Sequence, residues 1–327
     1  MITTTLTLGQ YIQFSQYYAS PTVLAPSFTG AIENSRFNAN WRDQWTKIPG
    51  TFTTYAAGFD KNVPKINSGF GFMVLRDQAG AGNLARTEFG ILYSWYGLLN
   101  RLTELYIRPG IELKLTQRSV DISALIFPDQ LLHNGNPQSQ PTSQPIPEEP
   151  NKYNFDGTAS ILLYNRKFWV GATADHLFRP AEYFYDQNYR VPIKYSAFGG
   201  YRFQLRGGGY KSFSSIQDYL FISGYFRMQA TNTQIDIGGY WDHQPLIIGL
   251  WVRGIPKLNR YSDPNIDAFV LLVGYRIFSF TIGYSYDITV SPLLGRTGGS
   301  HEISITYNFY SNLKSKRRDG PLPCPGI

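Results

Sequence analysis

Hydrophobic and polar residues alternate one by one along most of this chain. Segment 278–287, FSFTIGYSYD, places two Phe, one Ile and two Tyr on one face and only Ser, Thr, Gly and Asp on the other. Segments 302–309, EISITYNF, and 105–115, LYIRPGIELKL, repeat the pattern. Successive side chains of an extended strand point to opposite sides, so each segment predicts a strand with one apolar and one polar face.

The same alternation predicts fourteen strands along the chain. They lie near 36–45, 51–60, 69–77, 84–96, 103–117, 153–164, 168–177, 195–203, 218–228, 232–241, 246–254, 266–276, 278–287 and 300–310. An even number fits a barrel with both chain ends on the periplasmic side.

The connections between the predicted strands differ in length between the two sides of the membrane. Those expected on the outer side are long and lie at 118–152, 178–194, 255–265 and 288–299. Several expected on the inner side are short, at 165–167, 242–245 and Ile277, with 204–217 as an exception.

The polar faces of these strands favour a wet interior over a dry core. Arg108, Glu112 and Lys114 share one face of the segment 105–115, and buried charges are costly in a packed sandwich. A soluble sandwich would show the same alternation. However, strands of about ten residues, aromatic residues near strand ends and glycines on the polar faces are typical of a membrane barrel. We therefore predict an all-β fold, a transmembrane antiparallel up-and-down β-barrel of about fourteen strands.

Composition supports this prediction. Charged residues make up only 16% of the chain and aromatic residues another 16%, whereas soluble domains carry about 25% charge. The mean hydropathy of −0.25 is unremarkable, because a barrel averages a lipid-facing and a lumen-facing set. No apolar run reaches the roughly 20 residues of a spanning helix.

Outside the strands the chain divides into three further segments. Residues 1–9 are interpreted as the remnant of an export signal, so that the mature chain is expected to begin near Gln10. Residues 10–35 form an irregular segment, rich in Pro, Ser and aromatic residues, that is expected to line or plug the lumen. The barrel follows at 36–310, and residues 311–327 form a basic tail.

The net charge of +7 does not indicate a nucleic-acid partner. Lys and Arg residues are spread along the chain, and the one dense cluster, from Lys314 to Arg318, follows the last strand. A nucleic-acid-binding domain would gather them on one face. The single cysteine, Cys324, cannot form an internal disulfide and is interpreted as a tail residue.

No motif in the sequence indicates catalysis, a metal or a cofactor. The histidines His133, His176, His243 and His301 lie on different segments without metal-ligand spacing. No GxSxG elbow is present, and no GK[ST] follows the glycines 207–209. An outer-membrane enzyme, the remaining alternative of this class, would need His, Ser or carboxylate side chains that converge on one rim, and the expected strands scatter them.

Several polar and aromatic residues are candidates for lumen or partner contacts. Arg42 is expected to face the lumen and to pair with a lumenal carboxylate such as Glu88 or Glu112, while Trp41 and Trp45 are expected at the outer membrane interface. Asp77, Gln78 and Asn83 are expected in an outer hairpin turn, either as turn-forming residues or as a contact surface. The other candidates are Asp43, Arg108, Glu112, Lys114, Asp287, His301 and Glu302. For these side chains a salt-bridge network that stiffens the barrel and recognition of a partner both remain open.

Five longer segments carry a family resemblance. They are FSQYYASPTVLAPSFTG from Phe14, NWRDQW from Asn40, DQAGAGNL from Asp77, GYSYDIT from Gly283 and GSHEISITY from Gly299. In this order they resemble the PorP/SprF family of type IX secretion system membrane proteins from Bacteroidota, over roughly residues 10–310. The Pro/Gln-rich segment 137–150 and the N-terminus depart from the family pattern.

The resemblance implies a barrel of the bacterial outer membrane that serves protein secretion and gliding motility. Its implied partners are outer-membrane lipid, other type IX secretion components and a secreted, adhesin-like protein. The barrel would bind and anchor that protein at the cell surface through a C-terminal secretion domain. The resemblance implies no catalysis. A porin-like channel for small solutes is the alternative function.

Overall fold

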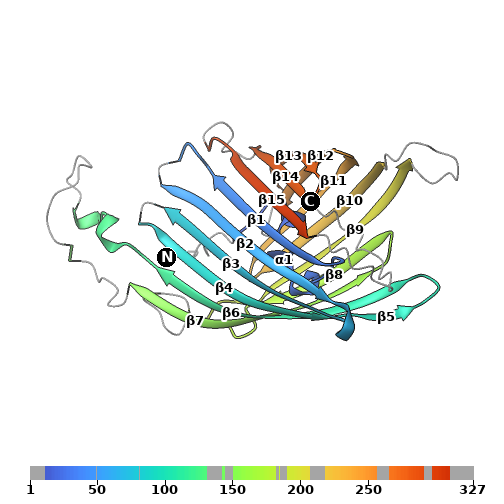
Figure 1. Ribbon diagram of the computed structural model, residues 1–327. Helices are drawn as coiled ribbons and strands as arrows, with labels where there is room; N and C mark the ends of the chain where they lie inside the picture. The colour runs from blue at the N-terminus through green and yellow to red at the C-terminus, as the bar shows by residue number, and fades with distance from the viewer. Residues whose placement is uncertain are drawn as a thin grey trace.

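The polypeptide folds into a closed barrel of antiparallel strands (Figure 1). The computed structural model describes residues 12–48, 50–80, 82–130, 142–143, 150–181, 184, 190–206, 218–255, 265–290 and 297–309. The expected tail 311–327, the segment 1–9 and most of the Pro/Gln-rich stretch lie outside these residues.

The wall of the barrel is built from strands that follow one another in sequence order. They are β1 (Ser35–Gln44), β2 (Thr51–Val63), β3 (Ser68–Gly80), β4 (Leu84–Trp95), β5 (Gly97–Asn100), β6 (Leu105–Ser119), β7 (Asn151–Tyr164), β8 (Phe168–Asp175), β9 (Lys194–Arg206), β10 (Asp218–Gln229), β11 (Asn232–His243), β12 (Leu246–Ile255), β13 (Asn265–Ile277), β14 (Phe280–Thr289) and β15 (Ser300–Phe309). β1 pairs with β15 and β4 with β6, which closes the ring. The short β5 continues β4 after Tyr96. With β4 and β5 counted as one strand, the wall has fourteen strands.

The predicted fold is therefore confirmed, and most predicted strands match within a few residues. One placement is wrong: Phe278 does not begin a strand but lies in the turn before β14 with a φ of 49°. Its side chain is 94% exposed. Strict alternation continued through the tight turn and concealed it, since a two-residue turn does not break a period of two.

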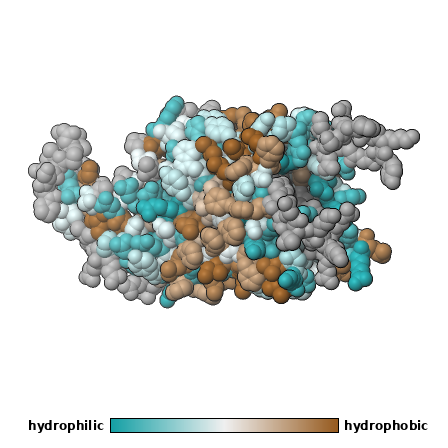
Figure 2. Space-filling view, in the orientation of Figure 1, coloured by the Kyte–Doolittle hydropathy of each residue, from teal (hydrophilic) through white to brown (hydrophobic). Residues whose placement is uncertain are grey.

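The two faces of the wall differ in polarity as the alternation requires. Along β14 every second side chain is buried, and these are Thr281, Gly283, Ser285 and Asp287. The side chains between them face outward and are apolar or aromatic. Figure 2 shows the hydrophobic residues as a band across the middle of the wall, with hydrophilic residues toward both ends. No helix among the described residues is long and apolar enough to span a membrane.

The two ends of the barrel carry different connections. We call the end with the β1–β2, β3–β4, β6–β7 and β8–β9 connections the loop end, and the opposite end the turn end. Bacterial barrels place long loops outside the cell and short turns in the periplasm. The connection between β6 and β7 is the longest, and it contains two 3₁₀ turns, η4 (Ile122–Ala124) and η5 (Pro128–Gln130).

The segment that precedes β1 is packed against the inner wall (Figure 1). It contains the 3₁₀ turns η1 (Tyr17–Ala19) and η2 (Pro26–Phe28) and the short helix α1 (Pro21–Leu24). We call residues 12–34 the inner segment. Its Tyr17 and Tyr18 pack on Trp251 with ring centroids 5.2 and 6.0 Å away. The buried apolar residues of the wall that join this cluster come from β7 to β13, and they are Leu162, Tyr164, Trp169, Phe198, Phe221, Tyr225, Tyr240, Ile247, Trp251, Val270 and Leu272.

Glycines on the inner face of the wall make room for this segment. A Cβ atom on Gly110 would lie 2.4 Å from the backbone nitrogen of Ser27, and one on Gly69 would lie 2.2 Å from the carbonyl oxygen of Thr29. Such distances are far below van der Waals contact. Gly69 and Gly110 are thus two points where the inner segment closely approaches the wall.

Candidate functional site

A buried network of charges holds the start of the inner segment. Arg42 of β1 places Nη2 2.8 Å from Asp287 of β14 and Nη1 3.1 Å from Glu302 of β15. Glu302 accepts the backbone N–H groups of Ser15 and Gln16 at 2.7 and 3.0 Å. Hydrogen bonds to charged groups are stronger than neutral ones, so this network fixes the segment to the barrel seam.

The network extends along the wall to β11 and β12. Arg253 places Nη1 2.8 Å from Asp287 and Nε 3.2 Å from Asp236. The Ser15 hydroxyl lies between both arginines, since it accepts from Arg42 at 2.7 Å and from Arg253 at 2.9 Å. One residue of the inner segment therefore connects several strands on the seam side of the wall.

The expected partners of Arg42 were wrong. Neither Glu88 nor Glu112 contacts it, because these carboxylates belong to β4 and β6, whereas β1 lies beside β15. A barrel closes by joining its first and last strands, and the nearest lumenal carboxylates of Arg42 therefore come from the C-terminal end of the sequence. The pairing of β1 with β15 cannot be predicted from the sequence of the first strands alone.

A second group of charges holds the other end of the inner segment, near the turn end. Asp60 accepts from Arg36 at 3.0 Å and from the backbone N–H of Gly30 at 2.7 Å. Arg108 donates to the carbonyl oxygen of Gly30 at 2.8 Å and lies over the ring of Tyr96. Gly30 has a φ of 64°, a conformation that glycine adopts readily. The expected lumen residue Arg108 is thus a structural anchor of the segment.

A cavity of about 720 Å³ lies between the inner segment and the wall toward the loop end. One part of its lining is apolar and includes Val23, Leu24, Phe52, Met73 and Leu75. Another part is polar and includes Arg86, Glu88, Glu112, Lys114, Asp175, His176 and Lys194. This division gives the cavity two chemically distinct walls. We call it the loop-end cavity.

Ion pairs organise the polar wall of the loop-end cavity. Asp175 accepts from Lys114 at 2.5 Å, from Lys194 at 2.8 Å and from the Thr158 hydroxyl at 2.6 Å. Glu112 differs, because its Oε1 atom is buried and has no hydrogen-bond partner among the described residues. Asp175 is therefore fully paired, whereas Glu112 is not.

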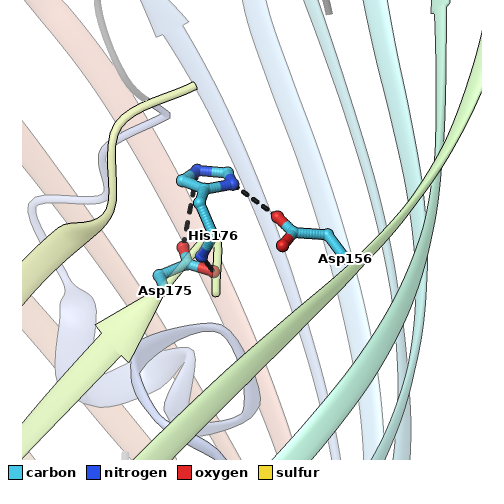
Figure 3. Close-up of side chains that lie close together, drawn as sticks. All are labelled: Asp156, Asp175 and His176. Carbon is cyan, nitrogen blue, oxygen red and sulfur yellow. Dashed lines mark hydrogen bonds and ion pairs between the residues drawn. The ribbon is translucent and has the colours of Figure 1, made fainter. Parts of the chain in front are cut away.

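His176 joins this wall and brings two aspartates together (Figure 3). Its Nδ1 lies 2.5 Å from Asp156 Oδ2, and its Nε2 lies 3.8 Å from Asp175 Oδ2. One imidazole and two carboxylates are a donor set that suits Zn²⁺. Here, however, Lys114 and Lys194 already neutralise Asp175, and both ammonium groups would repel a cation. The cluster is therefore organised as an ion-pair network.

The remaining candidates are spread over the loop end. Asp77 and Gln78 line the cavity from β3 rather than a turn, and Asp77 accepts from the Thr54 hydroxyl at 2.6 Å. Of these three candidates, only Asn83 lies in the turn, with a φ of 44°.

Three further candidates make local contacts. Trp45 packs on Phe52, Asp43 accepts from Thr53, and the His301 imidazole pairs with the Tyr284 hydroxyl at 2.8 Å. Trp41 lies on the outward face of β1.

Sequence reasoning missed several residues of these networks. Ser15, Asp175, His176, Asp236 and Arg253 were not among the candidates. All but Ser15 belong to a strand or the residue after it, and the alternation places Asp175, Asp236 and Arg253 on lumen-facing positions. Inspection of every charged residue at such positions would have found these three. Ser15 offered no signal, because the position of an irregular segment in the lumen depends on tertiary contacts.

Comparison with known proteins adds a family match. The family model described as "Type IX secretion system membrane protein PorP/SprF" matches residues 7–307. None of the curated proteins compared with the chain matches it. Similar solved structures include the outer membrane protein Omp33 of Acinetobacter baumannii, 8% identical over 86% of this chain and 100% of that chain, with a TM-score of 0.46. They also include the toluene transporter TbuX of Ralstonia pickettii, 9% identical over 89% of this chain and 94% of that chain, with a TM-score of 0.48.

Proposed function

We propose, from the premise that this chain belongs to the PorP/SprF family of type IX secretion system membrane proteins, that it anchors a secreted protein at the cell surface. The barrel lies in the outer membrane. The proposed partner is an adhesin-like protein, held through its C-terminal secretion domain, and other type IX secretion components act with the barrel. No catalytic step belongs to this proposal.

The observation that carries the proposal is an occupied lumen with a cavity toward the loop end. Residues of the inner segment contact strands on all sides of the barrel, from β1 and β15 through β7 to β12. A solute channel needs a continuous wet passage, and an aromatic cluster around Tyr17 and Tyr18 occupies part of that path. An anchor needs only a rigid receptor that faces outward.

The loop-end cavity offers such a receptor a place to hold its partner. Its apolar part, with Met73 and Leu75 of β3, lies beside its charged part, with Glu112 and Lys114 of β6, in a cavity of about 720 Å³. An extended polypeptide that lies across both parts would have apolar contacts at one and polar contacts at the other. The partner's segment would place apolar side chains toward Met73 and Leu75 and polar ones toward Glu112 and Lys114. Ion pairs that already fix Lys114 and Asp175 reduce the entropy lost on binding.

The test is affinity purification of the tagged barrel from detergent-solubilised outer membranes. We expect a large secreted protein to be recovered, and its recovery to be lost when its C-terminal domain is deleted. A barrel with Met73→Lys, which places an ammonium in the apolar wall, should lose the partner. A matched variant on the lipid-facing side of the same strand, Phe72→Leu, should retain it. Recovery that does not depend on the C-terminal domain would contradict the proposal.

Conductance measurements distinguish the anchor from the alternative function, a porin-like channel for small solutes. The wild-type barrel in planar bilayers is expected to stay closed, since the inner segment is tied to both ends of the lumen. Steady single-channel currents through the wild-type protein would favour the channel over the anchor.

A further inference from the structure

The outward face of the barrel seam carries a groove that the anchoring function does not use. It measures about 360 Å³ and is formed over β1, β2, β3 and β15. Ala39 and Ala57 lie directly opposite each other in the β1–β2 register and form its floor. Ile305 and Val74 are their neighbours on the outer sides. The groove forms because the small side chains of Ala39 and Ala57 lie between the larger side chains of Ile305 and Val74.

Rows of large side chains bound the groove above and below. Toward the loop end the register places Trp41 beside Tyr55, and Tyr55 beside Arg76. Toward the turn end it places Phe37 beside Phe59, and their rings lie in a row with Phe72. The groove is therefore an open notch in the outer surface with aromatic residues at both ends.

Arg76 is the unusual member of this surface. It is exposed on the lipid-facing side of β3, four residues before the strand ends at Gly80. Among the described residues it makes no hydrogen bond or ion pair. An outward arginine is costly near the middle of a bilayer, and the cost falls toward the interface. A lipid headgroup that carries a negative charge would offset it.

Trp41 and Tyr55 indicate the depth of Arg76 in the membrane. Trp and Tyr are enriched at the boundary between hydrocarbon and headgroups, and here they share one row with Arg76. The guanidinium therefore lies where a phosphate group would lie, and the groove below it lies where an acyl chain would lie. Planar guanidinium groups bind phosphate oxygens with two parallel hydrogen bonds.

We propose that this groove is a specific site for an anionic, phosphate-bearing lipid of the membrane leaflet at the loop end. Arg76 holds the phosphate, and one acyl chain lies over Ala39 and Ala57 between the two aromatic rows. The charge of the unpaired arginine selects an anionic lipid, and the apolar notch selects a chain rather than a free phosphate ion.

Trp41 supplies the readout of the experiment. Purified wild-type barrel is placed in phosphatidylcholine vesicles that contain a minor fraction of phosphatidylglycerol brominated on its acyl chains. The Trp41→Phe variant, measured in parallel, isolates the contribution of Trp41 from the other tryptophans. Brominated phosphatidylglycerol should be enriched roughly fivefold over brominated phosphatidylcholine near Trp41, the preference expected for one interfacial cation.

Three variants test the assignment. Arg76→Gln should lower the preference to that of the zwitterionic lipid, whereas Lys61→Gln, which removes an exposed cation from the turn-end part of the neighbouring strand, should keep it. Ala57→Phe should reduce quenching by filling the notch while leaving Arg76 in place. Heat-modifiable gel mobility checks that each variant is folded.

Three results would overturn the proposal. Equal quenching by both brominated lipids would show that the headgroup is not selected, and a preserved preference in Arg76→Gln would remove the arginine from the site. Quenching by neither lipid would mean that a polypeptide, such as a second copy of the chain, covers the groove.

Discussion

The backbone N–H of Ser15 donates to the carboxylate of Glu302 at 2.7 Å, and this bond joins residues 287 positions apart. Glu302 also accepts from Gln16 and pairs with Arg42. The carboxylate thus connects the inner segment, the first strand and the last strand at the seam where the barrel closes. Stability of the seam and position of the inner segment are consequently coupled.

Glu302→Gln is expected to lower the free energy of unfolding by about 3 kcal/mol, because breaking a buried charge network leaves Arg42 with one carboxylate instead of two. Urea unfolding in detergent micelles, followed by tryptophan fluorescence, measures the change. Ser304→Ala removes only the hydroxyl that donates to Gln16 Oε1 at 2.7 Å, and it should cost about 1 kcal/mol. Equal effects of the two variants would contradict the central role of Glu302.

Deletion of residues 12–30 is expected to open the lumen. The inner segment occupies part of the lumen with buried aromatic and polar side chains, and the wall itself closes through strand pairing without it. Planar-bilayer recordings should show single-channel steps for the deletion variant and a closed state for the wild type. A folded deletion variant that does not conduct would show that other parts of the chain close the pore.

Gly110→Ala is expected to destabilise the protein by about 1–3 kcal/mol, since its Cβ would lie 2.5 Å from the carbonyl carbon of Pro26 in η2. Gly224→Ala is the matched control, because a Cβ there has no neighbour closer than 3.7 Å. The control should change the unfolding free energy by less than about 0.5 kcal/mol. Limited proteolysis adds a second readout, in which only Gly110→Ala should expose the inner segment to cleavage.

Glu112→Gln is expected to leave stability unchanged or to raise it. Its Oε1 has no donor, so the amide removes a poorly compensated buried charge. Asp175→Asn should instead lower the unfolding free energy by about 3 kcal/mol, because Lys114 and Lys194 both pair with this carboxylate. Chemical unfolding of the two variants measures both changes in the unfolding free energy. A greater decrease for Glu112→Gln than for Asp175→Asn would contradict the conclusion that Asp175 is the paired carboxylate.

The strands and their two faces were determined by the sequence alone. A period of two specifies which side chains share a face, and this local property needs no knowledge of neighbours. Arg108, Glu112, Lys114, Asp287 and Glu302 lie on the faces that this period predicts to be polar, and their side chains are buried in the structure. The short extension β5 escaped notice because four residues carry too little of the pattern.

The partners of those side chains were decided only by the tertiary structure. Closure of the ring brings β1 beside β15, and so Arg42 meets Asp287 and Glu302 rather than a carboxylate from a nearby strand. The course of the inner segment depends on contacts with many strands at once, which no local pattern encodes. Alternation describes each strand alone, whereas the lumen is formed by all of them together.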